Sequence, residues 1–311
     1  MPGMIRVIIT GADGFVGSYT ARCFAEHGVS VLAVDRLAEP RRLVLSKRLS
    51  YLQADITDLE SLRAVLPQLE FDTFIHLAWM GSAGSERSDY RLQMQNALCA
   101  VDCLKFAKQI GCKRFVCAGS IMEREVEAVV HSQGSKPGAA YIYGMGKHIA
   151  HSLCKAVAAE IGVDLIWPII TNAYGEGEYS PRFINTTIRK ILRREPLQFT
   201  SGTQNYDFVH VEDVARALYL ISEHGKPFYE YLIGSGSARP LRQFVLELQR
   251  TLAPEAEPLF GDLPYTGINM PLSAFDTSVT EKDCFFRAEI PFAAGVRRTM
   301  DWLKTVEGEL A

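Results

Sequence analysis

The stretch that decides the fold is Val7-Ile8-Ile9-Thr10-Gly11-Ala12-Asp13-Gly14-Phe15-Val16-Gly17. Its apolar half is typical of a buried parallel strand, and its three glycines at intervals of three are typical of a tight turn into a helix. In such a turn Gly11 permits the bend, Gly14 lets the backbone approach a pyrophosphate, and Gly17 lets the helix pack against the strand. The motif predicts a dinucleotide site at a helix N-terminus, although its spacing also fits an ordinary strand-to-helix turn.

The strand expected after this helix, at residues 30–35, supports the dinucleotide interpretation. It ends in Asp35, 18 residues after Gly17, where a dinucleotide fold places the acid that hydrogen-bonds the adenosine ribose. Because this acid repels a 2′-phosphate, we expect NAD as the cofactor. Arg36 beside it is the feature that would accommodate NADP instead.

Strand and helix patterns alternate from the glycine turn to Pro168. We expect further strands at 51–54, 73–78, 114–118 and 164–167, and helices at 15–27, 59–66, 90–110 and 143–161. This alternation predicts an α/β fold, a doubly wound parallel sheet of the Rossmann type.

The alternation stops after Pro168. The patterns there predict a basic helix at 180–194, a strand pair formed by 197–200 and 206–211, a strand at 229–233, and helices at 212–224, 241–252 and 295–303. We expect residues 1–168 to form the dinucleotide-binding domain, with 206–236 returning to it. Residues 169–205 and 237–311 would form a small substrate-binding cap over the carboxyl ends of the strands, where such sheets bind ligands.

Composition narrows the possible partners. The 311 residues carry a formal net charge of −3, which gives no basic field for nucleic acid. No apolar run approaches the roughly 20 residues that span a bilayer, and the first strand leaves no room for a signal peptide. The seven cysteines form no Cys-x-x-Cys pair or His cluster. We therefore expect a cytoplasmic protein with reduced thiols and no metal site.

Three residues form the expected catalytic set. Tyr143 and Lys147 share one face of a helix, and Ser120 directly follows the fifth strand. The pKa of a free tyrosine is about 10, so acid–base work near neutrality requires a shift of perhaps three units, or about 4 kcal/mol. A nearby ammonium and a positively charged nicotinamide both favour the phenolate. With Ser120 polarising the substrate oxygen, the set predicts proton exchange with an alcohol whose carbon exchanges hydride.

The chain resembles the extended short-chain dehydrogenase/reductase superfamily, in its NAD-dependent epimerase/dehydratase branch. The resemblance covers nearly the whole chain and rests on motifs at 10–17, 55–58, 76–78, Asn96, Ser120, 143–147, 172–175, 207–213 and 261–264. It implies that Asp55 and Ile56 contact adenine, that Leu77 to Trp79 line the cofactor, and that Lys147 also touches the nicotinamide ribose. It also implies a homodimer in which helices 90–110 and 143–161 form a four-helix bundle.

The complete set of expected cofactor residues combines this resemblance with the glycine motif. It comprises Gly11, Asp13, Gly14, Phe15, Val16, Gly17, Asp35, Arg36, Asp55, Ile56, Leu77, Ala78, Trp79, Asn96, Tyr143 and Lys147. For the substrate we expect Ser82, Ser120, Tyr143 and Asn172, although the loop of Ser82 also fits an ordinary polar loop.

Two departures from the family pattern bear on the substrate. Dehydratases of this branch carry Asp-Glu where this chain has Ile121 and Met122, which argues against a 4,6-dehydratase. The remaining activities are 4-epimerisation, ketone reduction and alcohol oxidation, and the chain also resembles nucleotide-4-keto-6-deoxyhexose reductases. Arginines that hold the substrate diphosphate in the family are replaced by Ile169, Tyr206 and Leu259.

The missing arginines leave two interpretations open. Either Arg182, Arg189, Arg239 or Arg287 has taken over, or the substrate carries no nucleotide diphosphate. We expect an NAD(P)-dependent epimerase or oxidoreductase acting on a secondary alcohol or ketone of a sugar or nucleotide sugar. The alternatives are a dehydrogenase or reductase of an unphosphorylated sugar or sugar acid, and a non-catalytic NAD-sensing protein.

Overall fold

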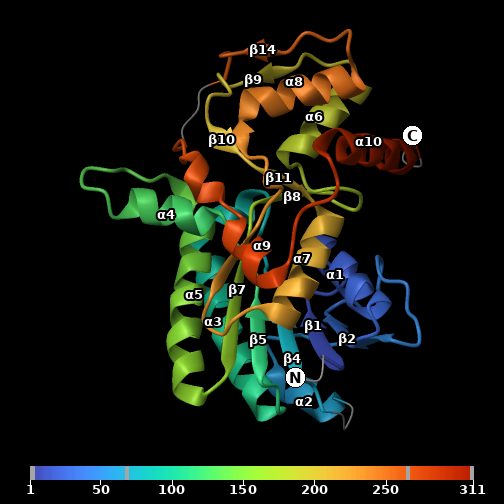
Figure 1. Ribbon diagram of the computed structural model, residues 1–311, viewed down its shortest axis with the longest axis vertical. Coiled ribbons are helices and arrows are strands. Elements are labelled where there is room, and N and C mark those ends of the chain that lie inside the picture. Colours follow the sequence, from blue (N-terminus) through green and yellow to red (C-terminus); the bar gives the residue numbers. More distant parts are fainter. Residues whose placement is uncertain (1–3, 67–69, 264–266, 309–311) are drawn as a thin grey trace.

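The computed structural model describes residues 4–66, 70–263 and 267–308, and a parallel sheet forms its centre (Figure 1). The strands follow the order β12-β7-β5-β4-β1-β2-β3, and β6 also pairs with β7. They are β1 (Arg6–Thr10), β2 (Ser30–Asp35), β3 (Leu49–Gln53), β4 (Thr73–His76), β5 (Arg114–Cys117), β6 (Gly119–Ser120), β7 (Asp164–Ile170) and β12 (Glu230–Ile233). The predicted doubly wound Rossmann-type fold is confirmed. Pro264, the last residue of the 261–264 motif, lies outside the described residues.

Helices cover both faces of this sheet because side chains alternate along its strands. On β1, Ile8 packs in the core shared with α2, α3 and α5, whereas Val7 and Ile9 pack in the core shared with α1, α7 and α9. These helices are α1 (Phe15–Glu26), α2 (Leu59–Val65), α3 (Tyr90–Gln109), α5 (Ile142–Ile161), α7 (Val211–His224) and α9 (Ser278–Cys284).

Pro168 interrupts the hydrogen-bonded ladder between β5 and β7. The amides of Trp167 and Thr171 donate to the β12 side, so even-numbered residues of β7 donate toward β5. Pro168 has no N–H to donate there. Pairing resumes as β6, which lies opposite Ile169 and Ile170, so β7 extends three residues beyond the predicted end at Trp167. Ser120 therefore lies at the end of a separate, short strand.

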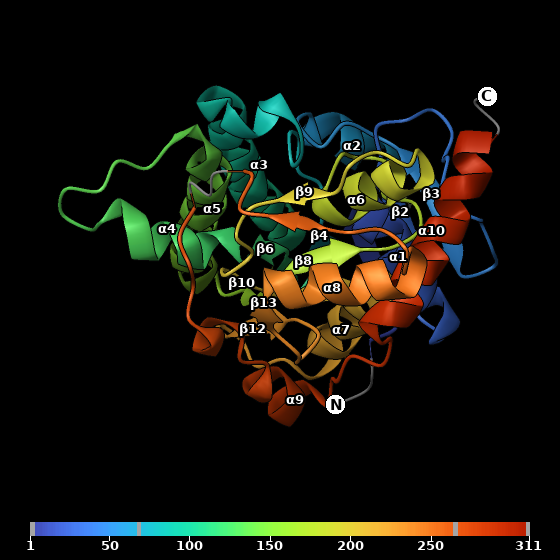
Figure 2. The same cartoon turned by 90° about the horizontal axis from the view of Figure 1, so that it is seen from above.

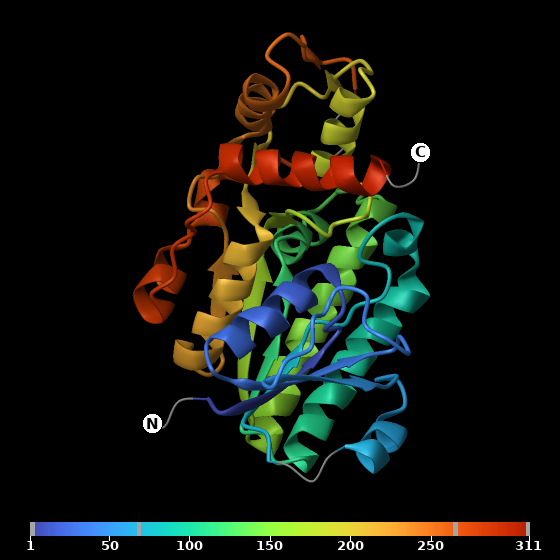
Figure 3. The same ribbon diagram turned by 90° about the vertical axis from the view of Figure 1, so that its right-hand side faces the viewer.

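The remaining elements lie beyond the carboxyl ends of the strands, at the top of Figure 1. Figure 3 shows α10 crossing below α6 and α8. Their apolar residues, including Ile188, Phe244 and Val296, pack in a third core. The elements are β8 (Asn172–Tyr174), α6 (Phe183–Leu192), β9 (Gln198–Phe199), β10 (Asn205–Tyr206), β11 (Phe208–His210), β13 (Arg239–Pro240), α8 (Leu241–Leu252), β14 (Leu259–Phe260) and α10 (Phe292–Gly308).

The predicted strand pair of 197–200 with 206–211 is wrong. β9 pairs with β14, β10 pairs with β13, and β11 pairs with β8. The loop between the two segments explains the difference, because its carbonyls at Gly202 and Gln204 accept the amides of Arg242 and Leu241 at 2.8 Å. The loop therefore caps the start of α8 instead of closing a hairpin.

Two α-helices of the described chain were not predicted, α9 and the helix that follows Ser120. α4 (Met122–Val130) follows Ser120 and projects from the body together with the loop after it (Figure 2).

Two acids of the 207–213 motif bind backbone amides of segments that lie far along the chain. Asp207 accepts the amide of Ser235, and Asp213 accepts the amides of Glu289 and Ile290. Within the described ranges, no helix combines the length and apolar character needed to cross a membrane.

Candidate active site

A cavity of about 1480 Å³ follows the carboxyl ends of the sheet strands. All predicted cofactor residues except Asp13 line it, and so do Ser82, Ser120 and Tyr143 of the predicted substrate residues. Its volume exceeds the roughly 300–1,000 Å³ of a pocket for one small ligand. The cavity therefore has room for a second ligand beside a dinucleotide.

The glycine turn at one end of the cavity requires its glycines. Gly11 has φ +67°, and a Cβ atom there would lie 2.6 Å from the backbone of Ala78. A Cβ atom on Gly17 would lie 2.0 Å from the carbonyl oxygen of Gly11. Gly14 precedes α1 without a side-chain cap, so amides at the start of α1 stay available to an anion. These features fit the pyrophosphate of a dinucleotide.

Asp35 lies at the end of β2, on the wall of the cavity. Its carboxylate accepts the amides of Asp13 at 3.0 Å and of Arg36 at 2.8 Å, which fixes the position of the carboxylate. Asp13, also predicted to bind the cofactor, does not line the cavity. Its buried carboxylate accepts the amides of Arg41, Arg42 and Leu43 at 2.7–3.1 Å and so holds the following loop against the turn.

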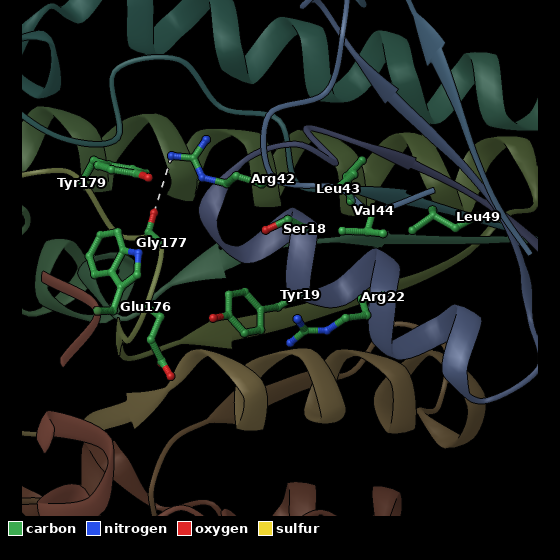
Figure 4. A pocket seen from close by; sticks show the side chains of 11 residues that line it. Ser18, Tyr19, Arg22, Arg42, Leu43, Val44, Leu49, Glu176, Gly177 and Tyr179 are labelled. Carbon is green, nitrogen blue, oxygen red and sulfur yellow. Dashed lines mark hydrogen bonds between the residues drawn. The ribbon is translucent and has the colours of Figure 1, made fainter. Parts of the chain in front are cut away.

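A second pocket of about 280 Å³ adjoins the glycine turn between α1, the 42–49 segment, the 176–179 loop and α10. Figure 4 shows Arg42 extending from one wall toward Gly177 and Tyr179. The guanidinium of Arg42 donates to Asp13 O at 3.1 Å and to Gly177 O at 3.5 Å, and it lies 5.1 Å from the ring centre of Tyr179. Arg42 thereby joins the glycine turn to the loop that borders the cap.

Ser120, Tyr143 and Lys147 all line the large cavity. Tyr143 and Lys147 lie one turn apart on α5, and the Lys147 ammonium donates to Ala118 O at 2.7 Å. The same ammonium lies 3.7 Å from the ring centre of Trp79, which stabilises its charge. Ser120 Oγ accepts the Met122 amide at 3.3 Å. β6 and α5 thus place the three predicted catalytic residues on the wall of one cavity.

Asn172 does not line the cavity. Its side-chain amide donates to Asp207 O at 2.9 Å and thus links β8 to the start of β11. Asn96 lines the cavity, and its side-chain amide both donates to and accepts from the backbone of Met80. It therefore also fixes the chain beyond β4.

Two charged residues that were not predicted from the sequence, Arg87 and Glu125, form an interacting pair beside Tyr143. The Arg87 guanidinium lies 4.5 Å from the centre of the Tyr143 ring, and burial lowers the pKa of Arg87. Glu125 of α4 interacts with Arg87, and burial raises the pKa of Glu125 to about 7. No spacing in the sequence relates these residues, because they come from the loop after β4 and from an unpredicted helix.

Among the four candidate substitutes for the missing arginines, Arg182 alone lines the cavity. Its Nη2 donates to Ser82 O at 3.3 Å, and its Nε lies 3.2 Å from Glu178. The other three pair with acids on the protein: Arg189 with Glu307, Arg239 with Glu247, and Arg287 with Glu281.

Comparisons with known proteins agree with this geometry. The family model described as the NAD dependent epimerase/dehydratase family matches residues 7–234. A protein of Sinorhizobium fredii described as a probable dTDP-glucose 4,6-dehydratase is 25% identical, over 96% of this chain and 92% of that protein.

Two solved structures share the fold. Bordetella bronchiseptica WbmF, in complex with NADH, is 23% identical, with a TM-score of 0.80 over 99% of this chain and 94% of that chain. MoeE5, in complex with UDP-glucuronic acid and NAD, is 26% identical, with a TM-score of 0.77 over 97% of this chain and 99% of that chain. Because the family model spans well over half of the chain, the predicted enzyme class and its cofactor NAD are confirmed: the chain belongs to the NAD dependent epimerase/dehydratase family.

Proposed function

We propose that this enzyme epimerises, oxidises or reduces a secondary alcohol or ketone of a nucleotide sugar, with Tyr143 as its acid–base group. The observation that carries the proposal is that Ser120, Tyr143 and Lys147 line the same cavity as the glycine turn and Asp35. NAD supplies the hydride acceptor or donor when it is bound.

Each of the three residues has a distinct part in this proposal. Tyr143 exchanges a proton with the substrate oxygen. Lys147 places a buried positive charge one helical turn away, where it favours the phenolate. Because Ser120 Oγ accepts the Met122 amide, the proton of its hydroxyl is available to the substrate oxygen.

The residues after Ser120 support redox or epimerase chemistry over dehydration. Ile121 is buried, and Met122 begins α4, so neither position offers an acid for the elimination of water. Glu123, the next residue, turns its carboxylate away from the cavity to the Ser120 amide and Trp167.

Arg182 supports an anionic substrate. We propose that its guanidinium receives the diphosphate of a nucleotide sugar in place of the family arginines. The specific observation that favours the alternative, an unphosphorylated sugar or sugar acid, is the apolar or aromatic character of Ile169, Tyr206 and Leu259.

The surface of α3 and α5 supports the expected homodimer. Leu98 of α3 is 55% exposed, and Met94 of α3 and Leu153 of α5 are also exposed. Since α3 and α5 lie side by side (Figure 1), these residues would face the same two helices of a second copy.

We propose the predicted division into a dinucleotide domain of residues 1–168 and 206–236, with a substrate cap of 169–205 and 237–311. Support comes from β12, which pairs with β7, and from the separate core of the cap elements. The seven free thiols support a reducing compartment such as the cytoplasm.

The acid–base role is tested with Tyr143→Phe. We expect turnover to fall by about 10²- to 10⁴-fold, the usual contribution of general acid–base catalysis, while the Kd for NAD measured by calorimetry stays unchanged. Turnover close to that of the wild type would refute the mechanism.

The substrate class is tested by thermal shift with NAD present, comparing UDP-, GDP-, CDP- and dTDP-sugars with unphosphorylated sugars and sugar acids. We expect nucleotide sugars to raise Tm and Arg182→Ala to weaken their binding by roughly 10-fold or more, as for the loss of a hydrogen bond to a charged group. Arg189→Ala, which removes a paired arginine outside the cavity, is the control. Stabilisation by the unphosphorylated set alone would establish the alternative.

The raised pKa of Glu125 predicts a pH-dependent stability. Because its folded-state pKa of about 7 exceeds the ordinary 4.5, the folded protein loses stability as pH rises from 4.5 through 7. Glu125→Gln removes this loss, so at pH 8 we expect its free energy of unfolding to exceed that of the wild type by up to about 3 kcal/mol. Near pH 4.5 urea denaturation should give equal values. Glu127→Gln on the exposed side of α4 is the control, and an unchanged difference across this pH range would contradict the prediction.

The dimer is tested with Leu153→Glu, which places a charge on the exposed side of α5 in the proposed interface. Light scattering after gel filtration should give a dimer for the wild type and a monomer for the variant. Val44→Glu changes an equally apolar residue that is 86% exposed elsewhere and should remain dimeric. A wild-type monomer would exclude the four-helix bundle.

A further inference from the structure

A buried polar cluster lies directly behind Ser120. It consists of Glu123 on α4, His151 on α5 and Trp167 on β7, none of which belongs to the cavity wall described above. Glu123 is 2% exposed. Burial of a carboxylate costs free energy unless its oxygens are well paired. The hydrogen bonds of Glu123 must therefore offset the cost of its burial.

Glu123 and Ser120 hold each other in place. Glu123 Oε1 accepts the Ser120 amide at 2.8 Å, while Ser120 Oγ accepts the Met122 amide at 3.3 Å. The pair follows the Ser-x-x-Glu pattern of a helix capping box. In this protein the box fixes both the backbone and the hydroxyl of the residue that faces the substrate.

The carboxylate of Glu123 is held from two further elements. The Trp167 indole N–H donates to its two oxygens at 3.1 and 3.2 Å, and His151 Nδ1 lies 3.2 Å from Oε2. The His151 ring stacks on Trp167 at 4.4 Å with an interplanar angle of 2°. Glu123 therefore has little freedom to release Ser120.

Gly119 makes this arrangement possible. A Cβ atom there would lie 2.3 Å from Trp167 Nε1 and 2.5 Å from Glu123 Oε1. The residue before the catalytic serine must therefore lack a side chain if the carboxylate is to reach the Ser120 amide.

We propose that Glu123 is a positioning residue that directs the Ser120 hydroxyl into the cavity, a role that rests on the catalytic function proposed above for Ser120. Glu123 acts through its hydrogen bond to the Ser120 amide and never touches the substrate. Loss of this bond frees the backbone at Ser120 and lets the hydroxyl turn away from the substrate oxygen.

The kinetic test compares Glu123→Ala with Glu127→Ala, a control on the same helix. We expect Glu123→Ala to lower kcat by about 10²-fold, as for a 1 Å displacement of a catalytic group, with KM unchanged. Glu123→Gln keeps an acceptor for the Ser120 amide and should restore most of kcat. In a Ser120→Ala background, Glu123→Ala should cause no further loss, because the two residues act as one unit. An equal loss in both backgrounds would overturn the proposal.

Hydrogen exchange at the Ser120 amide gives a readout that needs no substrate. We expect faster exchange in Glu123→Ala and in Glu123→Asp, because the aspartate keeps the charge but is too short to accept the Ser120 amide. Exchange in Glu127→Ala should be unchanged. Should the wild type turn over no sugar of the panel, the proposed function fails, while this measurement still decides whether Glu123 holds Ser120. Wild-type exchange in Glu123→Asp would show that it does not.

Discussion

The close approach of the glycine turn to the end of β4 is the constraint on which the site depends. Because Gly11 has no side chain, its backbone lies against Ala78, and the next residue, Trp79, places its ring below the Lys147 ammonium. The distance between the cofactor end of the cavity and Tyr143 is therefore set by backbone contact. Side-chain motions cannot relax such a contact, which is why a larger residue at Gly11 would displace several parts of the site at once.

A second constraint comes from a missing donor. Pro168 leaves β5 without a partner amide at the point where the chain must leave the sheet, and β6 then carries Ser120 on a short strand of its own. Two residues paired with β7 would not by themselves fix the proposed catalytic hydroxyl of Ser120. The buried carboxylate of Glu123 supplies the missing constraint, and Gly119 makes room for it.

Local spacing predicted the parts of the molecule that depend on neighbours in sequence. The glycine turn, Asp35 and the Tyr143–Lys147 pair each follow from one element or one connection. The strand partners beyond Pro168 could not be found in this way, because they lie far apart in the chain. For α4, the local signals were the Ser120–Glu123 capping pattern and the helical spacing of Met122, Val126 and Val129. Asp13 and Asn172 have suitable side chains, but the carboxylate of Asp13 and the side-chain nitrogen of Asn172 bind backbone groups.

The charges around Tyr143 bear on the substrate. Arg87 and Arg182 interact with each other unfavourably, and burial already disfavours the charge on Arg87. Glu178 lies near Arg182, whereas Glu125, with its pKa raised to about 7, is only partly ionised at neutral pH. Arg87 and Arg182 thus have two carboxyl groups nearby, and burial disfavours the charge of one of them, Glu125. An anionic group of the substrate would relieve their repulsion and keep Glu125 protonated, whereas a neutral sugar would leave the positive charge uncompensated. The charges near Tyr143 and Arg182 therefore support the proposed anionic substrate.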